Sequence, residues 1–338
     1  MNIRFQNAIQ GKEQKVPPIW FMRQAGRYHK HYQALRQKHS FMELCKNPDL
    51  AAEVTMGPIM DFDFDVAIIF SDLLFPLEAL GMGLDYAPGP KLGFHLNEKS
   101  IDNLKDPLAV VSELDFQRQA LIAARSRLPS HKSLIGFVGG PWTLFSYAVQ
   151  GTHDGHLLEA KKNFSIFPKF SEILLPLLKE NIKLQLAGGA EVVMVFDTAA
   201  GALAPQQYTQ WVVPVLEDLA HSFPGKLGYY ARDTHPAHYQ AELFQKNIFA
   251  GMGYDHRWKI PELLGKQKGF VQGNFDQSLL FLSPSEFQHS LLDYLKEIKK
   301  LDVAQRRGWV CGLGHGVLPN TPEENVRFFV RFVREFLG

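Results

Sequence analysis

Two arginines four residues apart are the first candidates for chemistry. Arg23 and Arg27 follow a short apolar run and flank Gly26, which allows the loop to bend sharply. Arginine carries a permanently charged planar fork that pairs bidentately with carboxylate or phosphate, so two on one loop suit a ligand with several carboxylates. The alternative is structural, with both arginines salt-bridged to acidic neighbours.

Two further candidates are an aspartate between apolar runs and a histidine between glycines. Asp72 should project from an apolar wall, where a carboxylate is paired, neutral, or available to a cationic or N–H-bearing ligand. It could instead cap the following helix. His315 lies between Gly314 and Gly316, which leave the imidazole exposed, and both functional and structural roles are open. The glycine spacing is not that of a dinucleotide-binding loop.

A glycine bend at residues 139–140 precedes an expected helix start, whose free N–H groups could receive an oxyanion. A purely packing role for these glycines is the alternative. Tyr147 would face the same rim one turn into that helix. His235 and His238 offer two imidazoles, but no cysteine is near and the surrounding carboxylates lack ligand spacing, so the pattern argues against zinc.

These candidates are separated by alternating short apolar runs and longer amphipathic segments. The apolar runs predict strands at residues 18–22, 66–70, 134–138, 192–196, 227–230, 248–252, 270–272 and 309–313. The amphipathic patterns predict helices at residues 49–60, 74–80, 110–127, 166–186, 205–222, 237–243, 284–300 and 322–337. Eight such alternations without a compositional break predict an α/β fold, a (β/α)8 TIM barrel, as a single domain over residues 1–338. Catalytic groups of such barrels gather at the C-terminal strand ends, where the candidates lie.

Local signals refine this expectation. Ser283 precedes Pro284 as a candidate N-cap, and residues 321–324 read as a capping box for the last helix. Residues 86–104 are expected to form a long surface excursion.

Composition excludes several classes of protein. The 338 residues carry a formal net charge of +1, so no global basic field suggests nucleic-acid binding. Cys45 and Cys311 have no disulfide-framework spacing, which fits a reducing compartment. The N-terminus shows no signal-peptide pattern and no apolar run is long enough to span a bilayer. A cytoplasmic protein that binds neither nucleic acid nor membrane is expected.

Longer stretches resemble the uroporphyrinogen decarboxylase family. Residues 18–28 match its signature Pro-x-Trp-x-Met-Arg-Gln-Ala-Gly-Arg-Tyr throughout, and residues 136–144, with Tyr147 and Gly151, match a second signature. Further matches are residues 70–72, 196–197 with 200–201, 272–274, and 313–316 with Pro319, 321–322 and 325–326. The resemblance covers essentially the whole chain.

The resemblance implies removal of the four acetate carboxylates of uroporphyrinogen III to give coproporphyrinogen III, without metal or organic cofactor, usually by a homodimer. By position, Asp72 matches the family's central aspartate, and Arg23 and Arg27 its loop arginines. The implied substrate contacts are Arg23, Gln24, Ala25, Gly26, Arg27, Asp72, Tyr147, Thr198 and His315. Thr198 replaces the usual serine, and Ala199 and residues 254–256 depart from the family pattern, which puts the fine fit of the substrate in question.

The implied chemistry needs an apolar cleft, for which Phe21, Met22, Phe70 and Phe75 are the candidate wall. One alternative is a zinc- and cobalamin-linked methyltransferase of the same superfamily, which would need cysteine ligands that the sequence does not place near its histidines. The other is a tetrapyrrole-binding protein without catalysis, and the presence of Asp72 and the arginine loop argues against it.

Overall fold

Seven parallel strands form the centre of the protein. The computed structural model describes residues 1–86, 89–246 and 248–338. The strands lie side by side in the order β1-β4-β5-β6-β7-β8-β9, so each neighbour is the next strand of this sheet along the chain. Their bounds are β1 Val66–Ile68, β4 Ser133–Gly139, β5 Val193–Phe196, β6 Leu227–Tyr230, β7 Gly251–Gly253, β8 Phe270–Phe275 and β9 Trp309–Leu313.

The expected first strand at residues 18–22 is an extended segment rather than a regular strand. It makes one parallel bridge, Ile19 with Cys311 of β9, and the Ile19 carbonyl accepts a hydrogen bond of 2.9 Å from the N–H of Asp65, just before β1. Pro17 and Pro18 lack the N–H donors that a longer ladder would need. The segment nevertheless connects the two edges of the sheet, and the predicted TIM-barrel fold class is confirmed.

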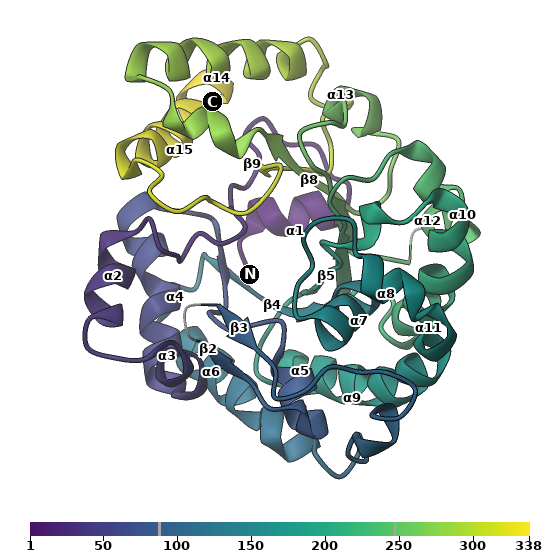
Figure 1. Cartoon of the computed structure of the whole chain (residues 1–338). Coiled ribbons are helices and arrows are strands. Elements are labelled where there is room, and N and C mark those ends of the chain that lie inside the picture. Colours follow the sequence, from purple (N-terminus) through teal and green to yellow (C-terminus); the bar gives the residue numbers. More distant parts are fainter. Residues whose placement is uncertain (87–88, 247) are drawn as a thin grey trace.

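Helices surround the sheet (Figure 1). Their bounds are α1 Ile3–Ile9, α2 Lys30–Arg36, α3 Phe41–Lys46, α4 Pro48–Phe62, α5 Phe75–Leu77, α6 Asp115–Arg127, α7 Pro141–Gln150, α8 Leu158–Lys162, α9 Phe167–Ala187, α10 Pro205–Gln207, α11 Val213–Ser222, α12 Glu242–Gln245, α13 Ile260–Leu263, α14 Pro284–Lys299 and α15 Glu323–Leu337. The helix expected at residues 205–222 is divided by a π-helical turn at Tyr208–Val212, before Pro214. Proline cannot donate to the helical ladder, which accounts for the break.

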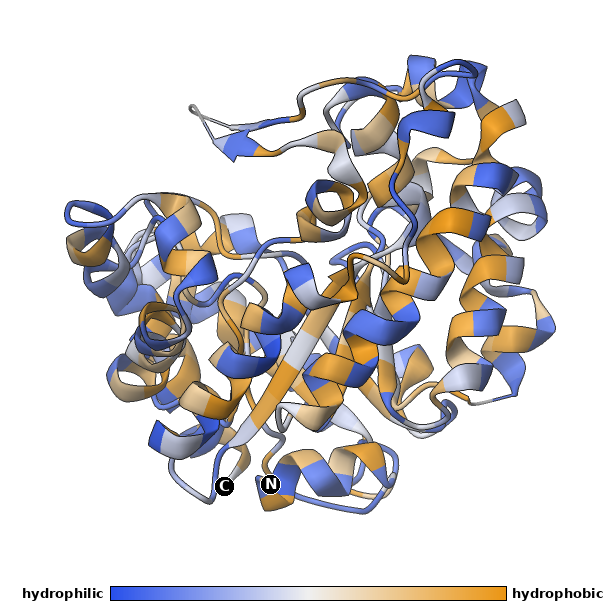
Figure 2. Cartoon of the chain, turned by 90° about the horizontal axis from the view of Figure 1, so that it is seen from below, coloured by the Kyte–Doolittle hydropathy of each residue, from blue (hydrophilic) through white to orange (hydrophobic). Residues whose placement is uncertain are grey.

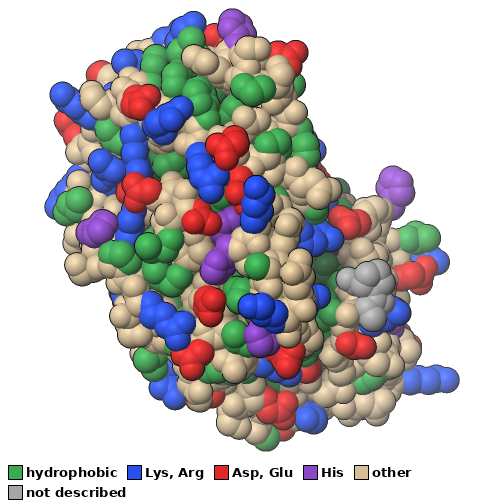
Figure 3. Space-filling model, turned by 90° about the vertical axis from the view of Figure 1, so that its left-hand side faces the viewer, with side chains coloured by type: hydrophobic (Ala, Val, Ile, Leu, Met, Phe, Trp, Pro, Cys, Tyr) green, Lys and Arg blue, Asp and Glu red, His purple; other side chains and the backbone are tan. Residues whose placement is uncertain are grey.

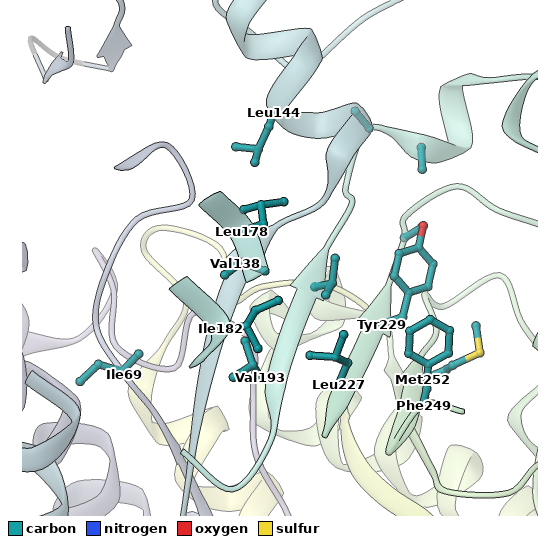
Figure 4. Packing of buried hydrophobic residues seen from close by; sticks show 14 of the residues in the cluster. Ile69, Val138, Leu144, Leu178, Ile182, Val193, Leu227, Tyr229, Phe249 and Met252 are labelled. Atoms are coloured by element: carbon teal, nitrogen blue, oxygen red, sulfur yellow. The ribbon is translucent and has the colours of Figure 1, made fainter. Parts of the chain in front are cut away.

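The two faces of the strands pack in separate layers. Side chains of one parity, including Trp20, Ile135 and Met194, fill the barrel interior together with Phe5 of α1. Side chains of the other parity pack outward against the helices, and Figure 4 shows Val193 of β5 beside Ile182 of α9. In Figure 2 the strands are mostly hydrophobic, whereas the surrounding helices alternate hydrophobic and hydrophilic residues. This period-two division decides which residues can reach the interior.

The chain between β1 and β4 makes the expected surface excursion. A short antiparallel hairpin, β2 Asp85–Tyr86 with β3 Pro90–Lys91, stands at its beginning, and residues 87 and 88 of the predicted excursion lie outside the described part of the chain. No helix among the described residues is both long and apolar enough to cross a membrane.

The two cap predictions have different outcomes. Ser283 is the N-cap of α14, where its N–H and hydroxyl both donate to the Glu286 carboxylate. The capping box at residues 321–324 is wrong, because Pro322 occupies the N-cap position of α15. The Thr321 hydroxyl instead donates to the Leu318 carbonyl over 2.8 Å.

A buried carboxylate holds the barrel together at the end closed by α1. Asp65 is 3% exposed and accepts hydrogen bonds from the Ile19 N–H at 2.9 Å and the Asn2 amide at 3.2 Å. Arg4 and Arg334 form ion pairs with it at 3.4 and 3.3 Å. We expect Asp65→Ala to lower the free energy of unfolding by about 3–5 kcal/mol, because it leaves buried partners without their acceptor.

Urea unfolding of this variant can be compared with Asp102→Ala, which removes only an exposed ion pair with Lys169 and should cost less than about 1 kcal/mol. Equal losses in the two variants would contradict the structural role given to Asp65.

Candidate active site

A cavity of about 970 Å³ opens at the C-terminal ends of the strands. Its walls come from the loop after residues 18–22, the β1–α5 connection, helices α2 and α3, and the ends of β4, β5 and β6. The site residues expected from the sequence that line it are Arg23, Ala25, Gly26, Arg27, Asp72, Tyr147, Thr198 and His315. The structure therefore brings together eight expected positions from five separate parts of the sequence, namely residues 23–27, 72, 147, 198 and 315.

The two loop arginines reach this cavity as free cations. Among the described residues, neither Arg23 nor Arg27 forms an ion pair with a carboxylate, so the structural alternative for them is wrong. Arg23 has a φ of 58°, a left-handed conformation that turns the chain immediately after the extended segment. A third arginine, Arg36 of α2, lines the same cavity. The local charge is thus positive although the whole chain is nearly neutral.

Gln24 has a different role from its neighbours. It is 1% exposed and does not line the cavity. Its amide donates to the Val66 carbonyl at 3.1 Å and its side-chain oxygen accepts from the Phe21 N–H at 3.2 Å. The expectation that Gln24 contacts substrate is therefore corrected: its side chain ties the arginine loop to β1.

Asp72 is the one carboxylate among the described residues that line the cavity. Its carboxylate accepts a hydrogen bond from the Leu74 N–H at 2.8 Å, and α5 starts beyond it with Leu74 at the N-cap position, so Asp72 is not the cap of that helix. Burial raises the pKa of Asp72, and the nearby Tyr86 hydroxyl, the Leu74 N–H and the Arg23 charge oppose this rise. The site thus holds an acid that costs free energy to ionise and lies near the positive charge of Arg23, with Arg27 lining the same cavity.

The helix N-terminus at residues 139–143 is already occupied from within the protein. Asp197 accepts hydrogen bonds from the N–H and the hydroxyl of Thr143 at 2.7 and 2.8 Å. Burial raises the pKa of Asp197 to about 6, opposed by these hydrogen bonds. The prediction that this helix start could receive an oxyanion from a ligand is therefore wrong. Gly140 supports the packing alternative, because a Cβ there would lie 2.3 Å from the Asp197 side chain.

Tyr147, Thr198 and His315 complete the far side of the cavity. The Tyr147 hydroxyl lies 2.6 Å from Nδ1 of His153, a cavity residue that the sequence analysis did not single out. Burial, together with the positive charges of Arg23 and Arg232, lowers the pKa of His315 to about 4. His315 is therefore neutral at physiological pH and can donate or accept hydrogen bonds there.

The expected apolar wall is half correct. Met22 and Phe70 line the cavity, whereas Phe21 packs outward against Phe64 and Phe329, and Phe75 against Phe116. Alternation along the extended segment explains the error at Phe21, which points to the opposite side from Met22, whereas Phe75 begins helix α5 and packs on Phe116 of α6. The same alternation places further aromatic groups in the wall that the sequence analysis missed, namely Phe137, Phe196 and Tyr230.

Two residues that depart from the family pattern, Ala199 and Tyr254, lie behind the cavity wall. Ala199 is buried, and its N–H donates to the Thr143 hydroxyl at 2.9 Å. Tyr254 is also buried, with its hydroxyl on the side chain of Gln267. Neither residue lines the cavity, so they do not contact a ligand that fills it.

Among the described residues, no three His, Cys, Asp or Glu side chains come together in an arrangement that could hold a metal ion. His238 is buried, with Nε2 3.0 Å from the Leu203 carbonyl. Cys311 is a free, buried cysteine within β9. On the face drawn in Figure 3, the described Lys and Arg side chains are interspersed with Asp and Glu. Strong positive character is therefore a property of the cavity rather than of this outer surface.

The fold and site define a (β/α)8-type protein with an arginine-rich cavity at the C-terminal strand ends. The chain matches the family "Uroporphyrinogen decarboxylase (URO-D)" over residues 1–336, and it belongs to that family. A protein of Solibacter usitatus named uroporphyrinogen decarboxylase is 34% identical, covering 99% of this chain and 98% of its own. One of Trichlorobacter lovleyi with the same name is 34% identical, covering 98% and 97%.

A solved structure shares the fold at lower sequence identity. It is described as a methyltransferase from Methanosarcina mazei and superposes with a TM-score of 0.79 at 16% identity, covering 99% of this chain and 98% of that one. This likeness shows the fold alone.

Proposed function

We propose that this protein decarboxylates the four acetate side chains of uroporphyrinogen III to methyl groups, giving coproporphyrinogen III, without metal or organic cofactor. The observation that carries the proposal is the cavity, in which Asp72, the one carboxylate among its described lining residues, lies near the charge of Arg23 and shares the lining with Arg27 and several aromatic side chains. A macrocycle with pyrrole N–H donors at its centre and carboxylates at its periphery has the complementary pattern.

The chemistry requires an electron sink for each departing carboxylate. Protonation of the pyrrole at its α-carbon gives an iminium-like cation, which accepts the electron pair of the breaking carbon–carbon bond as carbon dioxide leaves. A second proton then adds to the exocyclic methylene, and the first is lost from the ring, so each acetate consumes one proton overall. Asp72 would stabilise the cation and accept the pyrrole N–H groups.

The arginines would hold the peripheral carboxylates. Arg23 and Arg27 are unpaired with protein carboxylates in the described structure and lie on a loop fixed by Gln24, so their charge is available to acetate and propionate groups. Arg36 adds a third such group. The aromatic wall would exclude water from the reacting carboxylate, which loses carbon dioxide more readily when desolvated.

Two predictions about oligomeric state and cellular location accompany this proposal. A homodimer and a cytoplasmic location are expected from the family resemblance and from the composition. Size-exclusion chromatography with light scattering tests the first of these.

The methyltransferase alternative is less well supported. It would need a zinc site, and the described residues offer no metal-ligand cluster near the cavity. A tetrapyrrole-binding protein without catalysis could use Asp72 to accept pyrrole N–H groups but would not need it to stabilise a cation, and turnover of uroporphyrinogen III distinguishes the two.

The pKa of Asp72 gives a pH prediction. The proposed mechanism needs the ionised carboxylate, and burial raises the pKa of Asp72 above that of an ordinary aspartate. Activity should therefore fall, as pH is lowered, at a higher pH than a surface aspartate would give. His315, with a pKa of about 4, should contribute no loss between pH 5 and 8. A kcat/KM profile that stays flat down to pH 4 would contradict this assignment.

The proposed function is tested by anaerobic incubation of the purified protein with reduced uroporphyrinogen III, with and without a strong chelator. Products are oxidised and separated by carboxylate number. We expect coproporphyrinogen at equal rates in both samples. Failure to turn over, or turnover that the chelator abolishes, would contradict the proposal.

A further inference from the structure

We propose that His153 and Tyr147 form a hydrogen-bonded pair that delivers the proton consumed at each decarboxylation. This inference rests on the proposed function and adds to it the route by which the proton arrives.

The geometry of the loop after α7 brings the two residues together. Helix α7 ends at Gln150, and Gly151 at its C-cap has a φ of 73°, a left-handed conformation suited to glycine. The chain thereby turns back, and Nδ1 of His153 lies 2.6 Å from the hydroxyl of Tyr147, with the ring centroids 5.1 Å apart. Both side chains line the cavity. The fold of the loop thus places the hydrogen-bonded pair in the wall of the cavity.

The two nitrogens of His153 face different surroundings. Nδ1 meets the Tyr147 hydroxyl, whereas Nε2 lies 3.8 Å from the carboxylate of Asp154. The side chain of His153 is only 14% exposed, but that of Asp154 is 70% exposed. His153 therefore lies between a solvent-facing carboxylate and the hydroxyl of the half-buried Tyr147.

The charges around the pair favour an imidazole that gives up its proton readily. Burial lowers the pKa of His153, Arg232 and Arg23 lower it further, and Asp154 opposes them. His315 is a further titratable side chain close enough to interact with His153, and it is neutral at physiological pH. Burial and the Asp72 carboxylate raise the pKa of Tyr147, so its hydroxyl remains protonated and relays a proton rather than storing charge.

The proton balance of the proposed step is simple. A proton from water first binds Nε2 of His153 at the edge that faces Asp154, which gives the imidazolium. The Tyr147 hydroxyl then gives its proton to carbon of the substrate while the N–H at Nδ1 of His153 replaces it, which leaves the neutral ring with its proton on Nε2. Proton exchange of the ring with water restores the Nδ1–H form, so one proton passes from water to substrate and no oxidant, reductant or further reactant is needed.

The test compares His153→Gln with His156→Gln in the anaerobic assay. Glutamine retains hydrogen-bonding capacity but does not titrate, and His156 is an exposed histidine on the same loop. We expect His153→Gln to lower kcat by roughly 10²-fold with little change in KM, as for loss of a general acid. Wild-type kcat should fall as pH rises through the pKa of His153, and His153→Gln should lack this dependence. His156→Gln should match the wild type in both respects.

Tyr147→Phe removes the same hydrogen bond from the other side and keeps the test informative if His153→Gln fails to fold. It should lower kcat by a similar factor, and the double variant should lose little more. Retention of kcat in His153→Gln within twofold, or an unchanged pH profile at lowered kcat, would overturn the relay. Failure of the wild type to turn over would overturn the proposed function as well, so the two failures are distinguishable.

Discussion

Replacing Asp72 by asparagine is expected to lower kcat by roughly 10²-fold or more. The amide keeps the shape of the side chain and can still accept from the Leu74 N–H, but it cannot stabilise a cation. The stability of the folded protein, in contrast, should not fall. Because burial raises the pKa of Asp72, its ionised form is unfavourable in the folded protein at neutral pH, and removing the charge should leave the melting temperature equal or higher.

The measurement is steady-state turnover of uroporphyrinogen III together with a thermal melt of the same sample. Asp106→Asn makes the same chemical change on an exposed loop and should leave both quantities unaltered. Near-normal turnover by Asp72→Asn would remove Asp72 from the centre of the mechanism. Loss of activity together with loss of folding would show that its role is structural.

Arg27→Ala should raise KM by roughly 10- to 100-fold while kcat changes little. A hydrogen-bonded charge contact is worth about 1.5–3 kcal/mol, and a carboxylate away from the reacting ring is held equally in the ground and transition states. The absence of a protein carboxylate partner for Arg27 in the described structure means that its removal leaves no buried charge behind, so folding should be unaffected.

Arg331→Ala, which removes an exposed arginine paired with Glu335 on α15, provides the matched control and should leave KM unchanged. Raising the salt concentration should weaken substrate binding to the wild type more than to Arg27→Ala, since one charge contact has been lost. A collapsed kcat with normal KM would assign Arg27 to the chemical step instead.

Much of the fold could be predicted because the strands are buried on both faces and separated by amphipathic helices. The runs of apolar residues did not reveal which alternate side chains point into the barrel and which point outward. Met22 points into the barrel and Phe21 away from it, yet both are equally apolar, and the choice depends on where the chain enters the sheet.

The site was predictable where a residue follows a strand end and less so elsewhere. Arg23 and Asp72 directly follow the first two apolar runs. Arg36, by contrast, reaches the cavity from helix α2, and no local pattern separates it from other surface arginines. Gln24 lies inside the signature but bonds to the backbone of β1, a contact that depends on the tertiary packing of the loop. His153 was missed because its contact with Tyr147 forms only where Gly151 turns the chain back after α7.

The most direct test of the central claim is a structure determined with coproporphyrinogen bound under anaerobic conditions. The account predicts the macrocycle in the cavity at the strand ends, with pyrrole N–H groups within hydrogen-bond distance of the Asp72 carboxylate. It also predicts peripheral carboxylates on Arg23 and Arg27. A tetrapyrrole bound elsewhere, or one seated in the cavity with its N–H groups turned away from Asp72, would contradict it.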